Sequence, residues 1–368
     1  MTLNKLKTNK EQTEAEKVVF PDPNLVIDND YDEIYIPTKY KMLLSLLFGF
    51  SWCLLSVYLA LPWIEDLSNS LGAVLAWIII TGIALVPGFA NAFLISGLLL
   101  DKRPDFSQEI TFPNISILIA AHNESECILQ TLQSITKQSY DAIIQVIVMY
   151  DGSTDDTLAI TQQYMSETST DNVTIVVIQQ SKNTGKAQAL NNGLERVIHG
   201  HVVTLDADSY LFKDALKNIV KNLVLGPAHT AAVAGTVLAR NSRKNWITKL
   251  QEWDYYQGIA VVKRIQSLFQ GTLVAQGAFS IYETNALRAI GGWPSTVGED
   301  IVLTWSFIEA GWRVSYAENA FVFTNVPEDY RSFYKQRKRW SRGLIEAFKH
   351  HPNILFKPRI NLPFVYLN

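Results

Sequence analysis

Cysteine is scarce in this sequence of 368 residues, where only Cys53 and Cys127 occur. Cys53 lies inside a long apolar stretch and Cys127 in the domain that follows it, so we expect no disulfide framework. We find no internal repeat either. Charged residues are missing from two stretches, 42–63 with 22 residues and 71–100 with 30 residues.

Both uncharged stretches are longer than the roughly 20 residues that a helix needs to cross a bilayer. They predict two transmembrane helices, at about 42–63 and 73–100. Pro87-Gly88 interrupts the second, which predicts a kink or a late start near Ala73. Buried helices of a soluble core are the alternative. The first stretch starts too far from the N-terminus, and lacks a cleavage site, to be a signal peptide.

The charges around these stretches predict their orientation. Cations lie before the first span and after the second, and acidic residues lie in the expected connecting loop: Lys39, Lys41, Lys102, Arg103, Glu65 and Asp66. Because Lys and Arg concentrate in cytoplasmic flanks, residues 39–103 predict a multi-pass anchor in the plasma membrane with both large flanks in the cytoplasm. The polar residues 1–38 predict a disordered cytoplasmic tail.

From about Asn114 the sequence repeats the order of apolar strand, polar turn and helix. Strands are predicted at 115–120, 143–149, 173–178 and 202–205. Continuous apolar strands that alternate with helices predict an α/β domain, at 112–326, with a Rossmann-like, mainly parallel sheet covered on both faces. Ligands of such sheets bind at the carboxyl ends of the strands, so the four polar turns should meet in one crevice.

The fourth strand is followed by two aspartates, Asp206 and Asp208, which flank Ala207. Two carboxylates in one tight turn suit Mg²⁺ or Mn²⁺ held jointly with a diphosphate. A solvated turn with a helix cap at Ser209 is the alternative. The preceding strand and the neighbouring polar clusters favour the metal.

Two other strand-end residues allow two interpretations each. Asp151 follows the second strand and can accept hydrogen bonds from a base or ribose, although Asp-Gly-Ser is also a common turn sequence. Lys186 follows Gly185, which leaves room for a phosphate, although a Gly-Lys pair can equally start a surface helix.

Candidate residues for the reaction itself lie further along the chain. Asp300 or its neighbour Glu299, before an apolar helix at 301–310, can act as general base or simply favour the positive helix N-terminus. The segment 276–280 places glycine beside Phe279 and Ser280, as sugar acceptor sites often do, but it can equally be a packed loop.

A basic, aromatic helix is predicted at 330–348, inside an amphipathic segment at 327–350. It can lie on a membrane surface with its cations at anionic headgroups. Arg339 can also bind a diphosphate in bidentate fashion, and Trp340 offers a flat face to a sugar ring. The two interpretations do not exclude each other.

The ordered motifs resemble the membrane-bound processive glycosyltransferases of family 2, which include poly-β-1,6-N-acetylglucosamine, hyaluronan, chitin and cellulose synthases. The resemblance covers about 115–348 and the two spans, and the Gln-Arg-Lys-Arg-Trp form of the QxxRW motif at 336–340 looks closest to the poly-N-acetylglucosamine branch. It implies a GT-A catalytic domain and a hexosyltransferase that uses a UDP-sugar and Mg²⁺ or Mn²⁺. The partners that it implies are the growing polysaccharide and the lipid bilayer, and no nucleic acid.

The resemblance also implies a role for each matching residue. Nucleotide contacts would come from His122, Asn123, Glu124, Asp151, Lys186, Asp206 and Asp208. Asp206 and Asp208 would hold the metal, and Asp300 would be the base of an inverting displacement. Acceptor and diphosphate contacts would come from Phe279, Ser280, Gln336, Arg339 and Trp340.

Two departures from the family pattern bear on this expectation. The first turn has Ala-Ala before His122 where the family has Pro and an aromatic residue, and Tyr150 precedes Asp151.

Residues 351–368 resemble only the start of a further membrane region, so the expectation includes a truncated sequence or another membrane subunit that completes an export channel. The alternatives are another processive synthase, a single-addition transferase on a lipid-linked acceptor, and a non-catalytic membrane scaffold.

Overall fold

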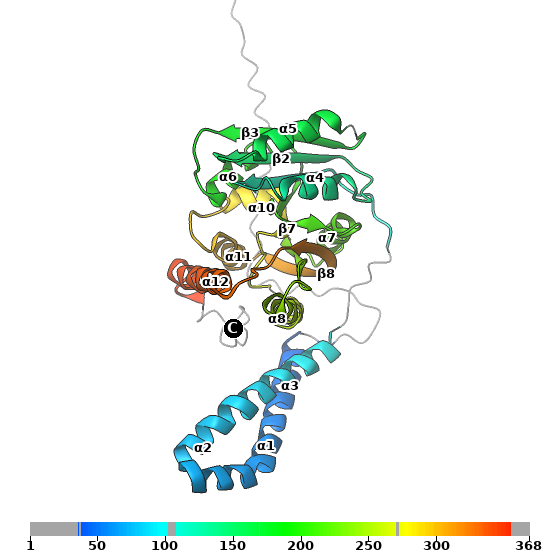
Figure 1. The fold of residues 1–368 in the computed structure, drawn as a ribbon. Helices are drawn as coiled ribbons and strands as arrows, with labels where there is room; N and C mark the ends of the chain where they lie inside the picture. Colours follow the sequence, from blue (N-terminus) through cyan, green and yellow to red (C-terminus); the bar gives the residue numbers. More distant parts are fainter. Residues whose placement is uncertain (1–35, 37, 102–107, 169, 270–271, 355–368) are drawn as a thin grey trace, which may run out of the picture.

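Two long apolar helical segments form a hairpin that projects from one end of an α/β domain (Figure 1). The computed structural model describes residues 36, 38–101, 108–168, 170–269 and 272–354. The first segment is α1 (Thr38–Leu71), and the second consists of α2 (Ala73–Ile80), the π-helix η1 (Thr81–Leu85) and α3 (Val86–Leu99). Both segments are long and apolar enough to cross a membrane, as predicted.

The hairpin differs from the prediction at its turn. The helix α1 continues past the apolar stretch, so Glu65 and Asp66 lie in its last turns and not in a loop. The prediction of a loop at these residues was wrong, because a charged residue ends an apolar stretch of sequence but need not end the helix. The second segment starts at Ala73 as expected, and its π-helical turns lie directly before Pro87, which cannot donate a backbone hydrogen bond.

The predicted tail at 1–38 and the predicted further membrane region at 351–368 lie almost entirely outside the described residues. Their structure stays a prediction. Between the hairpin and the first strand, the cations expected after the second span, Lys102 and Arg103, also lie outside the described residues.

Within the described residues, eight strands form one sheet in the order β3-β2-β1-β4-β7-β6-β8-β5. The first half is parallel and consists of β1 (Ile115–Ala121), β2 (Ile144–Asp151), β3 (Val173–Gln180) and β4 (His201–Leu205). Its connections are α4 (Ile128–Thr136), α5 (Thr157–Glu167) and α6 (Lys186–Leu194). The predicted α/β architecture is therefore confirmed for this half.

The second half of the sheet mixes strand directions. Its strands are β5 (Tyr210–Leu211), β6 (Thr230–Ala239), β7 (Phe279–Glu283) and β8 (Arg313–Thr324). β7 runs antiparallel to both β4 and β6, whereas β6 and β8 are parallel. Four further helices belong to this half: α7 (Ala215–Val224), α10 (Thr284–Ala289), α11 (Glu299–Glu309) and α12 (Tyr330–His350).

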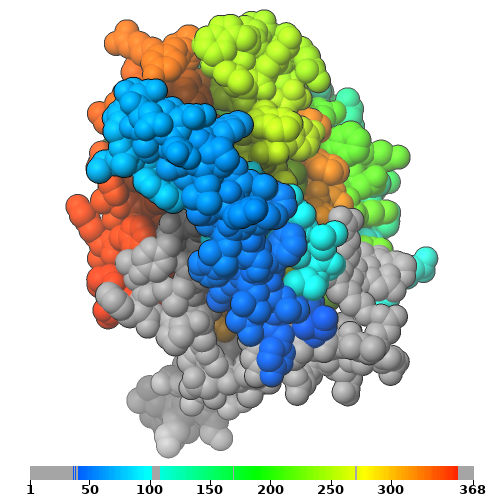
Figure 2. Space-filling model, turned by 90° about the horizontal axis from the view of Figure 1, so that it is seen from below, coloured from blue at the N-terminus to red at the C-terminus, as the bar shows by residue number. Residues whose placement is uncertain are grey.

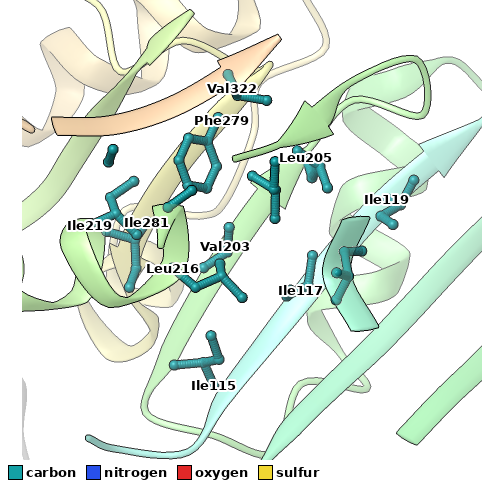
Figure 3. Close-up of a cluster of buried hydrophobic side chains, with 14 of the residues drawn as sticks. Ile115, Ile117, Ile119, Val203, Leu205, Leu216, Ile219, Phe279, Ile281 and Val322 are labelled. Atoms are coloured by element: carbon teal, nitrogen blue, oxygen red, sulfur yellow. The ribbon is translucent and has the colours of Figure 1, made fainter. Parts of the chain in front are cut away.

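The main core lies where the two halves of the sheet meet. Figure 3 shows side chains of β1, β4 and β7 pointing toward α7, with Ile117, Val203 and Ile281 beside Leu216 and Ile219. All five are fully shielded from solvent. Burial of such side chains stabilises a fold by about 1.5 to 3 kcal/mol each. This layer therefore stabilises the sheet, whose carboxyl edge carries the polar turns.

The hairpin joins the domain through α9 (Val262–Leu268), which follows α8 (Trp246–Asp254) and the π-helix η2 (Tyr255–Val261). Gly97 of α3 lies against Ile265, where an added Cβ would come within 3.1 Å of the isoleucine. The guanidinium of Arg264 pairs with Asp101 at 2.5 Å, and both side chains are almost fully buried. Seen from below, the hairpin in blue crosses the face of the domain (Figure 2).

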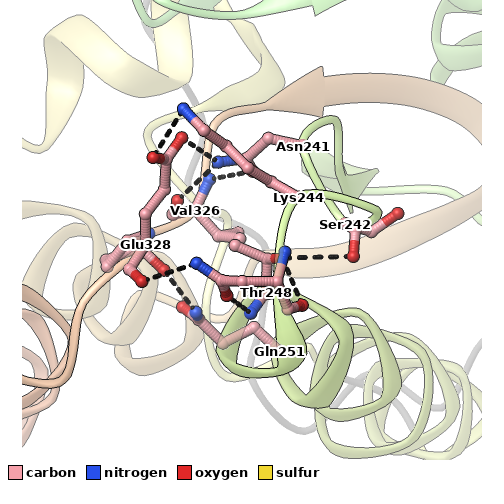
Figure 4. A network of polar contacts seen from close by, with 9 residues as sticks. Asn241, Ser242, Lys244, Thr248, Gln251, Val326 and Glu328 are labelled. Carbon is pink, nitrogen blue, oxygen red and sulfur yellow. Dashed lines mark hydrogen bonds and ion pairs between the residues drawn. The ribbon is translucent and has the colours of Figure 1, made fainter.

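A polar network fixes the segment that leads from β8 into α12 (Figure 4). The amide group of Asn241 exchanges hydrogen bonds of 2.9 Å with the backbone of Val326. Gln251 of α8 donates to the carbonyl of Pro327, and Lys244 pairs with Glu328 at 2.7 Å. The start of α12 is thus held against α8.

Loss of the buried Arg264 cation is expected to destabilise the protein strongly. In Arg264→Met, Asp101 stays buried without its partner, which typically costs about 3 to 5 kcal/mol. Arg243→Met is the matched control, because its ion pair with Glu252 is 79% exposed on the arginine side and such pairs contribute about 0 to 1 kcal/mol. Denaturant unfolding in detergent measures both; equal losses would contradict the prediction.

Candidate active site

The turns after β1 and β2 are fastened to each other at the carboxyl edge of the sheet. The ring of His122 donates through Nδ1 to the carbonyl of Asp151 at 2.9 Å. Asn123 accepts from the backbone of Thr154 at 2.8 Å, and the backbone of Glu124 donates to Thr157 at 2.8 Å. Three residues predicted to bind the nucleotide, His122, Asn123 and Glu124, are therefore neighbours on one edge.

Asp151 is buried and its carboxylate is already engaged. One oxygen accepts from the backbone and hydroxyl of Thr184, at 2.8 and 3.0 Å, and the other from the backbone of Gly185 at 2.9 Å. These bonds fix the start of α6. The turn is tight at Gly152, whose φ of +63° suits glycine and whose added Cβ would lie 2.6 Å from the backbone nitrogen of Asn183.

Lys186, the first residue of α6, connects the strand ends with α11. Its ammonium forms a short ion pair with Asp206 and lies 3.8 Å from Glu299. Burial alone would lower the pKa of Lys186, but the charges of Asp206, Glu299 and Asp300 outweigh it and raise this pKa above its ordinary value. The cation stays protonated between the carboxylates.

Negative charge is concentrated around the turn after β4. Burial, together with the charge of Asp206, raises the pKa of Asp208. Burial and the charges of Asp208, Asp206 and Asp155 raise the pKa of Glu124 to about 7. Burial is the largest cause of both raised pKa values, and the neighbouring carboxylates add to it, so further positive charge at this turn would favour the ionised form of Asp208.

A divalent cation fits this chemistry, because Asp206 and Asp208 offer the oxygen ligands that Mg²⁺ and Mn²⁺ prefer. Among the described residues, no group of three or more His, Cys, Asp or Glu side chains is arranged to hold a metal ion. An ion at Asp208 would thus take most of its ligands from substrate or water.

The catalytic candidates Glu299 and Asp300 lie at the N-terminus of α11. The backbone of Gly277 donates to Asp300 at 3.3 Å, and that of Ile301 donates to it at 2.9 Å. Burial, and next the charge of Asp300, raises the pKa of Glu299. Sequence patterns did not single out Lys263, a buried lysine of α9 whose pKa burial lowers to about 7 and the charge of Asp300 partly restores.

Phe279 and Ser280 do not face an acceptor, and the prediction for them was wrong. Both are completely buried in β7. The ring of Phe279 fills the space beside Gly235, and the hydroxyl of Ser280 donates to the carbonyl of Gln276 at 2.8 Å. Phe279 and Ser280 therefore belong to a packed strand start, in which Gly235 leaves room for the Phe279 ring.

The motif residues of α12 lie along one side of that helix. Trp340 is half-buried, with its ring 6.4 Å from that of Tyr255. The guanidinium of Arg337 lies 4.3 Å from the Trp340 ring and pairs with Asp254 at 2.6 Å. The buried Oε1 of Gln336 has no hydrogen-bond partner among the described residues. Arg339 is exposed. Sequence patterns missed Tyr255 and Asp254, since neither belongs to a recognisable motif.

An open cavity of about 470 Å³ lies beside Lys186 and Glu299. It extends between the start of α6, the segment before α11 and the second half of α12. Its polar lining includes Lys186, Glu299, Arg342 and Lys349. A volume of this size suits a small ligand, so Lys186, Glu299 and the second half of α12 share an accessible space.

Comparison with known proteins places this chain among sugar transferases. The family described as "Glycosyltransferase like family 2" matches residues 113–343. Poly-beta-1,6-N-acetyl-D-glucosamine synthase from Staphylococcus aureus is 30% identical over 245 residues, 66% of this chain and 57% of the relative. The Staphylococcus epidermidis protein of the same name is 32% identical over 234 residues, 62% and 54% of the two chains.

A solved structure shares the fold at lower identity. It is a mannosyltransferase from Pyrobaculum calidifontis in complex with GDP-Man and Mn²⁺, with a TM-score of 0.62, 23% identity and coverage of 79% of this chain and 80% of that chain. The present chain spans little more than half the length of the synthases above.

The raised pKa of Glu124 predicts a pH-dependent stability. Between its ordinary pKa of 4.5 and about 7 the folded protein holds a proton that the unfolded chain releases, so the contribution of Glu124 to the free energy of unfolding falls as pH rises. Position 124 cannot ionise in Glu124→Gln. The free energy of unfolding of this variant, relative to that of the native protein, should therefore increase as the pH rises across this interval.

Melting temperatures at several pH values, in detergent and without divalent metal, measure this effect. Glu126→Gln, two residues away and exposed, is the control that should show no such trend. Parallel pH curves for Glu124→Gln and the native protein would contradict the assignment.

Proposed function

The chain belongs to the glycosyltransferase family 2, and we propose that it transfers N-acetylglucosamine from a UDP-sugar to a growing polysaccharide, with inversion at the anomeric carbon. The observation that carries the proposal is the bridge of Lys186 between Asp206 and Glu299, because it puts the strand-end carboxylates next to the candidate base. The staphylococcal relatives, named as N-acetylglucosamine polymer synthases, support this choice of sugar.

The donor would bind along the carboxyl edge of the parallel strands. In this proposal uridine lies at the turns after β1 and β2, against His122, Asn123 and Glu124, with Asp151 shaping the floor. A bound Mg²⁺ or Mn²⁺, held by Asp208 and Asp206, would supply charge neutralisation to the departing diphosphate. The mannosyltransferase of similar fold was solved with a nucleotide-sugar and Mn²⁺, which supports a metal in this fold.

Transfer would proceed as a single displacement. Asp300 takes the proton of the acceptor hydroxyl while that oxygen forms a bond to the anomeric carbon. The bond from this carbon to the diphosphate breaks, and its electron pair leaves with UDP. The ammonium of Lys186 and the guanidinium of Arg339 would stabilise the developing negative charge.

The motif residues of α12 would complete the acceptor side. Gln336 has a buried acceptor atom without a partner among the described residues, which suits a substrate hydroxyl. Trp340 would offer a ring face to the terminal sugar of the acceptor, and Arg339 is exposed beside it. These assignments leave out Phe279 and Ser280.

We place the enzyme in the plasma membrane with its catalytic domain in the cytoplasm. The two apolar helical segments support an anchor, and the cations around them support this orientation. The amphipathic segment 327–350 would lie at the membrane surface. A further membrane subunit, or a membrane region following this sequence, would complete a channel for the polymer.

Incubation with separate UDP-sugars tests the proposed function. Membranes that contain the protein should release UDP from UDP-N-acetylglucosamine and form a polymer. Digestion of this polymer with a set of linkage-specific glycosidases then identifies its linkage. EDTA should stop release, and Mn²⁺ or Mg²⁺ should restore it. A single added sugar would indicate a non-processive transferase, and no UDP release from any common donor would contradict enzymatic function.

Removal of the candidate base should separate catalysis from binding. Asp300→Asn is expected to lower polymer synthesis about 10²-fold or more, the typical loss when a general base is removed, while UDP-sugar binding persists. Asp141→Asn is the matched control, since this aspartate is 77% exposed and pairs with Lys217 on the surface. Full activity of Asp300→Asn in membranes would refute the base assignment.

A further inference from the structure

The helix α12 crosses the start of α11 at a contact between two backbones. A Cβ built on Gly343 would lie 2.9 Å from the Cα of Gly298, and one built on Gly298 would lie 2.6 Å from the Cα of Gly343. Real side chains do not approach so closely, so both positions require glycine for this packing. Gly298 immediately precedes α11, which begins at Glu299.

Glu346 fastens the same crossing one turn further along α12. Its Oε2 accepts a hydrogen bond of 2.7 Å from the backbone of Val297, and its Oε1 accepts one of 2.8 Å from Arg342. The bond to Val297 holds the backbone that leads into Gly298. The end of α12 is fixed as well, because His351 contacts Glu309 at 2.7 Å.

The crossing defines the path between two residues of the proposed reaction. Asp300 lies two residues after Gly298, and Trp340 lies three residues before Gly343, about 4.5 Å along the helix axis. Two short stretches of chain and the contact of Gly298 with Gly343 therefore connect the proposed base with the proposed acceptor-binding tryptophan. The two atoms nearest to a Cβ added at Gly343 belong to the backbone of Gly298, so a change there must move backbone.

We propose that Gly343 and Glu346 are positioning residues that set the separation of Asp300 from Trp340 and so decide whether a sugar hydroxyl or a water molecule attacks the donor. The inference rests on the proposed function. If the separation is correct, Asp300 takes its proton from the acceptor. If α12 is displaced, water enters instead: its oxygen bonds to the anomeric carbon, its proton goes to Asp300, and UDP leaves together with free N-acetylglucosamine.

Gly343→Ala is the principal test, with UDP release and polymer formation measured together. Because misplacement by about 1 Å can cost about 10²-fold, polymer formation should fall by at least about 10-fold. UDP release by hydrolysis should persist or rise, and the KM for the donor should change little. The ratio of hydrolysis to transfer should therefore rise at least about 10-fold, a change that follows from altered geometry and not from a smaller amount of folded protein.

Gly200→Ala is the matched control, because Gly200 is exposed and an added Cβ meets nothing within 4 Å. Its ratio should equal that of the native protein. A folded Gly343→Ala protein with an unchanged ratio of hydrolysis to transfer would show that the contact has no positioning role. That result would overturn the inference.

Glu346 gives a second test, which stays decisive if Gly343→Ala does not fold. Glu346→Gln keeps an oxygen that can accept from Val297 and should keep the native ratio, whereas Glu346→Ala should raise the ratio of hydrolysis to transfer. If Glu346→Gln and Glu346→Ala had the same ratio of hydrolysis to transfer, this inference would be overturned, but the proposed function would stand. A native protein that releases no UDP from any donor would overturn the proposed function as well.

Discussion

The ion pairs of Lys186 are the interaction on which the rest of the site depends. Asp151 fixes the turn before α6 through three hydrogen bonds, and the lysine that follows this turn contacts Asp206 on one side and Glu299 on the other. One cation thus balances charges from the parallel strands and from α11. Without it, the two groups of carboxylates would repel each other across the crevice.

The parallel half of the sheet could be predicted because each strand is a continuous apolar run followed by a polar turn and a helix. The second half could not: β5 (Tyr210–Leu211) has only two residues, and β6 and β8 pair across about 80 residues. Phe279 and Ser280 were misinterpreted because glycine beside an aromatic ring occurs in packed strands as well as in loops. The contact of Gly298 with Gly343 leaves no local signal, since the two are 45 residues apart.

The site is also connected to the membrane hairpin. One apolar cluster joins Phe93 of α3, Ile265 of α9, Trp305 of α11 and Ala347 of α12. The helix that carries Asp300 at its start is therefore packed, further along, against the same cluster as the hairpin. The two apolar helical segments thus support α11 and α12, the helices that carry the proposed base and the proposed acceptor residues.

If the strand-end carboxylates and the helices α11 and α12 act on one donor molecule, a structure of the protein in a bilayer with UDP-N-acetylglucosamine and Mn²⁺ will show all of them around that molecule. We predict uridine at the turns that carry Asn123 and Asp151, the metal at Asp208, and the anomeric carbon facing Asp300. A nucleotide bound away from these turns, or a sugar directed away from Asp300, would contradict the account.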